Sequence, residues 1–113
     1  MVAMKLGIVA KTQLAEAVEL SRKVLEIAGE ERVVLGPQIS RALNATFRPE
    51  EFKNVGAVIA IGGDGTVLRA HRLVVEKPVI GINVGERGFL AEAEPAEVEA
   101  VVENLLKKRF EVL

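Results

Sequence analysis

The sequence predicts an α/β fold in which a parallel sheet is flanked by helices. Short runs of β-branched and small apolar residues alternate along the chain with longer segments whose apolar residues recur at helical spacing. The run 55–61 carries no charged residue, which is typical of a strand buried on both faces of a parallel sheet. Strands that alternate with helices favour parallel neighbours joined by right-handed crossovers.

The composition is that of a single soluble globular domain. Of the 113 residues, 50% are hydrophobic and 27% are charged, and 15 basic against 16 acidic residues leave a net charge of −1. This balance gives no indication of nucleic acid or an anionic membrane as a partner. No apolar run approaches the length of a membrane span. The chain contains no cysteine, which excludes disulfides and thiolate zinc sites and is compatible with the cytoplasmic location that we expect.

The first part of the chain predicts two strands separated by a helix. Short apolar runs at 6–10 and 32–35 predict the strands. Helical spacing of apolar residues predicts a helix over 14–28, with Thr12 as its candidate cap and Gly29 as its end. Its inward stripe is expected to comprise Leu14, Ala17, Val18, Ser21, Val24, Leu25 and Ala28.

The stretch after the second strand shows less periodicity. Residues 38–43 predict a short helix. Its inward side chains are expected to be those of Ile39, Ala42 and Leu43. Residues 44–54 lack a clear apolar period and contain Pro49, so a loop is expected there.

The second part of the chain repeats the alternation after the strand at 55–61. A helix is expected over 66–75, a buried strand over 78–83, and a last helix from Pro95 to 109, with proline in its first turn. The side chains expected to face the sheet are Val67, Ala70 and Val74 from the first helix and Val98, Val101, Val102, Leu105 and Leu106 from the second. Residues 110–113 predict the beginning of another strand.

A glycine-rich turn follows the central strand and carries the chemistry. Gly62, Gly63 and Gly65 supply no side chain that would keep a phosphate away from the backbone amides, and Thr66 begins a helical segment. Asp64 is the one carboxylate in the turn. Open α/β sheets place their ligands at such junctions of a strand and a helix, so the turn predicts a nucleotide-phosphate site that contains an acid.

Several roles are open for Asp64 at this point. It could accept the proton of an attacking hydroxyl in phosphoryl transfer, since positioning and charge stabilisation supply most of the catalysis there. It could coordinate Mg²⁺. It could also do no more than cap its helix. The turn matches neither a Walker A loop, because no Gly-Lys-Ser/Thr follows, nor the G-x-G-x-x-G pattern.

A second glycine-punctuated loop follows the strand at 78–83 and spans residues 84–90. The strands that lead into the two loops are separated by one helix, so both loops are expected at the same edge of the sheet, lining one cleft. The junction after the first strand, at 10–13, has no glycine and is left out of the expected site.

The two loops together resemble the amino-terminal domain of NAD kinases. The turn GGDGT at 62–66 is shared with lipid kinases and approximately with phosphofructokinases, whereas the stretch GINVGERGFL at 81–90 separates NAD kinases from both. The resemblance extends from the first strand to the end of the chain. It implies a Rossmann-like parallel sheet, transfer of a phosphoryl group to the 2′-hydroxyl of the NAD adenosine ribose, and NADP as product.

The resemblance also implies roles for individual residues. Asp64 matches the family's proton acceptor. The residues that match NAD-binding positions are Asp64, Gly65, Leu68, Arg69 and Phe89, of which Leu68 and Phe89 would form apolar walls. Those that match the site of the phosphoryl donor are Gly62, Gly63, Gly65 and Thr66, with Asn83 in a supporting role. The implied donor is ATP or polyphosphate with Mg²⁺ or another divalent metal, and no residue is assigned to the metal.

Some of these side chains also have purely structural interpretations. Arg69 could be a solvated helix residue, Phe89 could belong to the core, and His71 is expected to be packed or to cap its helix.

NAD kinases carry a second, β-rich domain that this sequence lacks, so residues 1–113 are expected to form only the amino-terminal nucleotide-binding domain. We therefore expect little or no activity from the isolated chain, and a homo-oligomer in the full-length protein. The alternatives are a lipid- or sugar-kinase-like domain and a nucleotide-binding module without turnover.

Overall fold

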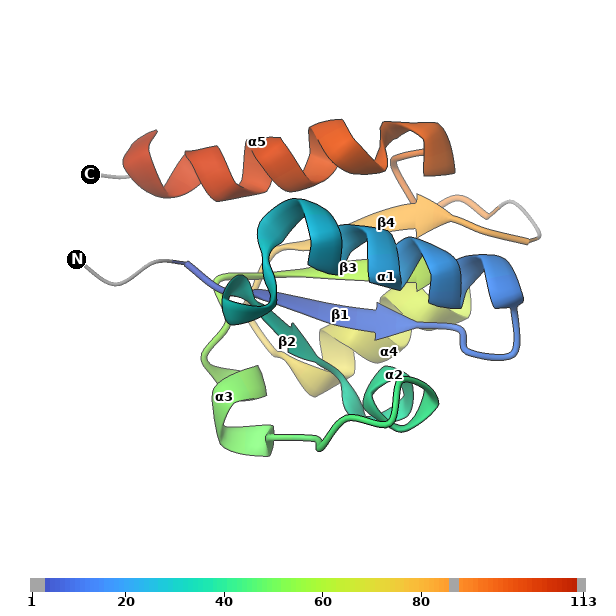
Figure 1. The fold of residues 1–113 in the computed structure, drawn as a ribbon. Coiled ribbons are helices and arrows are strands. Elements are labelled where there is room, and N and C mark those ends of the chain that lie inside the picture. Colours follow the sequence, from blue (N-terminus) through green and yellow to red (C-terminus); the bar gives the residue numbers. More distant parts are fainter. Residues whose placement is uncertain (1–3, 86–87, 112–113) are drawn as a thin grey trace.

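The computed structural model describes residues 4–85 and 88–111. It contains a parallel four-stranded sheet with helices on both faces (Figure 1), which confirms the predicted fold class. The strands are β1 (Leu6–Ala10), β2 (Val33–Leu35), β3 (Ala57–Gly62) and β4 (Val79–Asn83). All of them run in the same direction, and their order across the sheet is β2-β1-β3-β4.

This strand order places a topological switch point between β1 and β3. The chain passes from β1 to β2 on one side and then returns to build β3 and β4 on the other. The last residues of neighbouring strands are in register, Ala10 with Ile61 and Gly62 with Asn83. The loops after β1, β3 and β4 therefore leave the sheet at one common edge, where α/β folds of this type bind ligands.

Two apolar clusters cover the two faces of the sheet. Because successive side chains of a strand point to opposite faces, Ile59 and Ile61 join one cluster while Val58 and Ala60 join the other. The first cluster includes side chains of α1 (Ala15–Ala28) and α5 (Val98–Glu111), which lie side by side over one face (Figure 1). The second includes side chains of α3 (Pro49–Lys53) and α4 (Asp64–Leu73). In the described part of the chain, no helix is long and apolar enough to cross a membrane.

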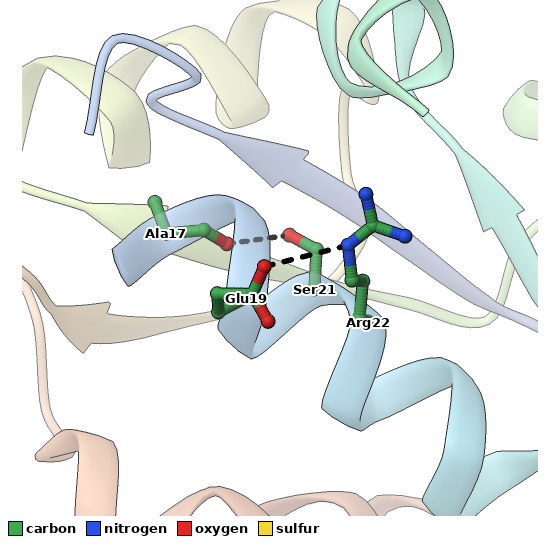
Figure 2. Close-up of polar contacts among 4 residues, drawn as sticks. All are labelled: Ala17, Glu19, Ser21 and Arg22. Atoms are coloured by element: carbon green, nitrogen blue, oxygen red, sulfur yellow. Dashed lines mark hydrogen bonds and ion pairs between the residues drawn. The ribbon is translucent and has the colours of Figure 1, made fainter. Parts of the chain in front are cut away.

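The helix α1 agrees with its predicted range, but its cap does not. The residue before the helix is Leu14, and no side chain caps its first turn, so the predicted role of Thr12 is wrong. The buried side chains of the helix include Leu20 as well as the expected Ala17, Ser21 and Val24. Ser21 is a buried polar residue, and its hydroxyl donates to Ala17 O at 2.8 Å (Figure 2), so its burial leaves no donor unpaired.

The polar side of α1 carries an ion pair that Figure 2 also shows. Arg22 Nε lies 3.5 Å from Glu19 Oε1, and both side chains are more than half exposed. Exposed pairs of this spacing contribute little to folding because water screens the charges. This side of the helix is therefore an ordinary solvated surface.

The prediction of a loop over 44–54 is wrong for its second half. Residues 49–53 form α3, because Pro49 occupies the first turn, where its fixed φ and missing N–H favour a helix start. The helix buries Phe52, whose ring lies edge-to-face with that of Phe47 at a centroid distance of 5.9 Å. The short helix before it, α2 (Pro37–Ala42), buries Ile39 as expected but leaves Ala42 exposed.

The remaining helices differ from prediction at their ends. α4 begins at Asp64 and ends at Leu73, each two residues earlier than expected. Val67 and Ala70 of the helix, and Val74 just after it, are buried as predicted. His71 lies exposed in the last turn of α4, so a packed role is wrong, whereas the capping role stays a prediction. α5 continues to Glu111, because no glycine or proline interrupts it, and the predicted strand is therefore wrong at 110–111. Residues 112–113 lie outside the described part of the chain.

The start of α5 and the loop before it are held against β4. Pro95–Glu97 form a short 3₁₀ turn in which the backbone N–H of Glu94 donates to Glu97 Oε1 at 2.8 Å, as part of a capping box. Just before it, the N–H groups of Glu92 and Ala93 donate to Gly81 O, and the N–H of Asn83 donates to Ala93 O. A side chain at Gly81 would meet the backbone of Ala91 at 2.7 Å, so glycine permits this close approach.

Candidate functional site

The turn between β3 and α4 exposes backbone N–H groups. Gly63 is the residue before α4, and its carbonyl accepts the N–H groups of Thr66 and Val67 at 3.1 and 3.2 Å. The N–H groups of Asp64 and Gly65 have no backbone acceptor within the described residues. A side chain at Gly65 would meet no atom of the described residues within 4 Å. The helix dipole and these two N–H donors together favour an anion here.

A cavity of about 450 Å³ opens in front of this turn. Its described lining residues come from the loops after β1, β3 and β4 and from α4, namely Lys11, Gln13, Gly63, Asp64, Gly65, Thr66, Arg69, Val84 and Gly88. The expectation that the two glycine-rich loops line one cleft is therefore confirmed.

The Asp64 carboxylate is bound to the second loop and does not cap its own helix. Oδ1 accepts the backbone N–H of Leu90 at 2.9 Å, and Oδ2 accepts that of Phe89 at 3.2 Å. No side chain caps the first turn of α4, so the alternative of a mere helix cap is wrong. The carboxylate is half-buried at the cavity wall, beside the positive end of the helix dipole.

Arg69 lies one turn further along α4 and reaches across the switch point. Its Nη2 donates to Ala10 O, the last carbonyl of β1, at 2.8 Å. Partial burial lowers the pKa of its guanidinium from the usual value, although an arginine remains charged at neutral pH. Within residues 4–85 and 88–111 no carboxylate pairs with it. Arg69 is thus a cation in the cavity wall without an anionic partner in the described part, not the solvated helix residue of the alternative interpretation.

Sequence reasoning missed two side chains of the cavity, those of Lys11 and Gln13. The loop that carries them has no glycine, so its sequence gives no sign of a phosphate site. Lys11 N donates to Ile61 O at 2.9 Å, so this loop starts directly beside the glycine turn. The pairing of β1 with β3 brings these residues to the site. The order of elements along the sequence does not reveal that these two strands are neighbours.

Two of the predicted phosphate-site residues, Gly62 and Asn83, are buried and do not line the cavity. Gly62 is buried, and a side chain there would collide with Thr66 Oγ1, so its role is to let β3 and α4 pack closely. Asn83 is 8% exposed, and its Nδ2 donates to Glu94 Oε2 at 3.2 Å. Its Oδ1 is buried without a hydrogen-bond partner in the described part of the chain. Asn83 thus joins β4 to the start of the last helix.

The predicted apolar walls stand outside the cavity. Leu68 is 46% exposed and Phe89 is 99% exposed, and neither is among its described lining residues. The alternative that Phe89 belongs to the core is therefore wrong. Both are exposed apolar side chains that follow or precede a lining residue in the sequence, Phe89 after Gly88 and Leu68 before Arg69.

The described residues do not build a metal centre of their own. Among residues 4–85 and 88–111, no group of three or more His, Cys, Asp or Glu side chains is arranged to hold a metal ion. Magnesium binds proteins through one or two carboxylates together with substrate phosphates and keeps several waters. The donor set of this cavity fits an ion that arrives on a phosphate ligand better than one held by the protein alone.

The fold and the site define a Rossmann-like α/β domain with a cavity at the switch point of its sheet. A family model described as the ATP-NAD kinase N-terminal domain matches residues 6–110, so the chain belongs to the NAD kinase family. The chain is 34% identical over 120 residues to the NAD kinase of Methanothermobacter thermautotrophicus, covering 96% of this chain and 41% of that protein. It is 38% identical over 114 residues to the NAD kinase of Chlorobium phaeobacteroides, covering 96% and 40%.

A solved structure gives the same result for the fold. The yeast NADH kinase complexed with NADH superposes with a TM-score of 0.78 at 18% sequence identity, over 96% of this chain and 40% of that one. The present chain therefore spans about 40% of the length of the relatives that it matches.

Proposed function

We propose that this domain supplies the phosphoryl-transfer machinery of a NAD kinase, which moves the γ-phosphoryl group of ATP to the 2′-hydroxyl of the NAD adenosine ribose and forms NADP. Membership of the NAD kinase family supports NAD and ATP as the substrates. The observation that carries the proposal is the placement of one carboxylate, Asp64, in a cavity beside two N–H groups that have no backbone acceptor in the described part of the chain. A phosphate and a hydroxyl can meet at that point.

The proposed step is an in-line displacement at phosphorus. The 2′-hydroxyl oxygen attacks the γ-phosphorus of ATP, a new P–O bond forms, and the bond to the β–γ bridging oxygen breaks. ADP leaves with the electron pair of that bond, and the hydroxyl proton passes to the Asp64 carboxylate. A positioned base of this kind contributes about 10²- to 10⁴-fold to the rate.

The cavity wall offers positive charge for the donor. The Lys11 and Arg69 side chains line it from opposite sides of the switch point, and α4 presents the N–H groups of Asp64 and Gly65. Phosphoryl transfer depends on such donors because negative charge spreads over the oxygens of the transferred group. We assign Lys11, Arg69 and the first turn of α4 to the phosphates of the substrates. A divalent ion would enter with these phosphates, and we assign no residue to it.

Further properties remain predictions that rest on the resemblance. Polyphosphate is an alternative donor, and NADH, the compound bound in the yeast relative's structure, is an alternative acceptor. Leu68 and Phe89 would border the NAD pocket, with Asn83 in a supporting role. Assembly of the whole protein as a homo-oligomer and a cytoplasmic location belong to the same group of predictions.

The test compares the 113-residue chain with a fusion of it to the carboxyl-terminal part of the Methanothermobacter relative. We expect the fusion to form NADP from NAD and Mg-ATP and the chain alone to form little or none. Phosphorylation of a lipid or sugar without NADP formation would contradict the proposal. If the fusion does not fold, NMR of the chain alone decides the donor site: Mg-ATP should shift the amide signals of Asp64 and Gly65, and unchanged signals would refute that site.

A further inference from the structure

The segment 88–90 binds the reactive carboxylate through its backbone. The N–H groups of Phe89 and Leu90 each donate to a different oxygen of Asp64. A carboxylate has about four lone-pair sites, so two of them remain for other donors. Two bonds from a rigid backbone fix both the rotamer and the plane of the carboxyl group, which one bond would not do.

Gly88 determines whether this contact can form. A Cβ built on Gly88 would overlap the Asp64 carboxyl group, with Oδ2 only 2.6 Å away. That separation is far below van der Waals contact, and the obstructing atoms are those of the carboxylate itself. Any side chain at residue 88 must therefore push Asp64 away from the two amides or push the loop away from Asp64.

The loop that carries these amides is anchored at both ends. At its start, Val84 N donates to Gly62 O at 3.1 Å, which ties the loop to the glycine turn. At its end, Asn83 N donates to Ala93 O at 2.9 Å, and Ala93 N donates to Gly81 O at 3.0 Å. These bonds tie the chain before and after the segment to β3 and β4, independently of the two bonds that the amides of 89 and 90 make to Asp64.

We propose that Gly88 is a positioning residue: its missing side chain lets the Phe89 and Leu90 amides clamp the Asp64 carboxylate in the orientation in which it accepts the hydroxyl proton. The role of the clamp in proton transfer rests on the proposed function. The two hydrogen bonds that form the clamp do not depend on that function. The clamp explains why glycine is needed at position 88, and this explanation does not depend on the side chain of Phe89. It also links the two glycine-rich loops into one unit.

The clamp can be tested without any nucleotide, because Asp64 is the only aspartate of the chain. Labelling aspartate with ¹³C at the carboxyl carbon gives one NMR signal, and hydrogen exchange reports on the two amides. We expect Gly88→Ala to move the carboxyl signal and to speed exchange at Phe89 and Leu90 by about tenfold or more. Amides of β3 should keep their rates. Asp64→Ala should speed the same two amides.

The double variant Gly88→Ala/Asp64→Ala separates the clamp from general loop strain. Without a carboxylate to displace, adding Gly88→Ala to Asp64→Ala should change the two exchange rates no further. Gly65→Ala is the matched control, since its methyl group meets no atom and should leave both amides unchanged. Unchanged exchange at Phe89 and Leu90 in Asp64→Ala would overturn the proposal, and so would an additive effect in the double variant. Neither result depends on kinase activity. If Gly88→Ala does not fold, Asp64→Ala alone decides.

Discussion

Arg69 and Ala10 lie 59 positions apart in the sequence and are joined by a hydrogen bond of 2.8 Å from the guanidinium to the backbone carbonyl. The bond crosses the switch point of the sheet, from the helix after β3 to the end of β1. The residue that follows Ala10 is Lys11, the second cation of the cavity. Arg69 therefore places its own positive charge in the cavity wall and also binds the end of β1, directly before Lys11.

Replacing Arg69 by methionine should weaken binding of Mg-ATP by about tenfold, because the cavity loses a cation and the β1 loop loses its anchor. Isothermal titration calorimetry on the 113-residue chain measures this. Arg72→Met is the matched control, since Arg72 lies exposed on the same helix and does not line the cavity. Equal affinity in the two variants would remove Arg69 from the donor site.

Lys11→Met should also weaken Mg-ATP binding, and the loss should shrink as salt concentration rises because the contact is electrostatic. The same change at Lys23, an exposed residue of α1 away from the cavity, should have no effect. Calorimetry at two ionic strengths distinguishes the variants. A loss that does not depend on salt would indicate a structural change of the loop instead of a lost phosphate contact.

Asp64→Asn should leave the fold intact and reduce NADP formation by the fusion protein at least about 100-fold, because asparagine accepts hydrogen bonds but not the proton. The asparagine oxygen can keep only one of the two backbone donors in place, so a loss of about 1–2 kcal/mol in unfolding free energy is expected. Initial rates and urea denaturation measure the two effects. Near-normal turnover with an intact fold would exclude Asp64 as the base.

Gly81→Ala should destabilise the domain by about 1–3 kcal/mol, since the methyl group would press against Ala91 and Val67. Gly65→Ala, with no atom near its methyl group, should be neutral or slightly stabilising. Urea denaturation measures the change in unfolding free energy of each variant, from the shift of the midpoint when the dependence on urea concentration (the m-value) is unchanged. Similar midpoints for the two variants would show that residues 91–93 do not pack on β4 as described.

Phe52→Ala should cost about 3–5 kcal/mol, because Phe52 is 2% exposed and its truncation leaves a cavity under β1 and β2. This prediction tests α3, the helix that the sequence did not reveal. Phe89→Ala is the control, since that side chain is 99% exposed and its loss should change stability by less than about 0.5 kcal/mol. Denaturant titration of both variants gives the comparison.

The sequence predicted the sheet and most of its helices because their evidence is local. The uncharged run before the glycine turn and the helical spacing of Val67, Ala70 and Val74 are readable without any tertiary information. The cleft was predictable too, since the strands before the two loops are separated by a single helix. The same local reasoning failed at Pro49, where one residue type is compatible with a loop and with a helix start.

The contacts that complete the site were not predictable in this way. Lys11 reaches the cavity only because β1 pairs with β3, more than 40 residues later in the chain. The carboxylate of Asp64 accepts hydrogen bonds from amides that are 25 and 26 positions away. Because the donors are backbone N–H groups, the residue types of Phe89 and Leu90 do not indicate this contact. Only Gly88 carries a signal, because its missing side chain is what allows the contact.

Residues 91–93 also have a consequence for how copies of this domain behave in a concentrated solution. An outer strand of a sheet normally offers unpaired N–H and C=O groups on which another molecule can add a strand. Here the carbonyl of Gly81 and the N–H of Asn83 on β4 are already bonded within the chain, and the strand at the opposite edge, β2, spans only Val33–Leu35. Edge-to-edge growth into aggregates is thereby disfavoured at both margins of the molecule.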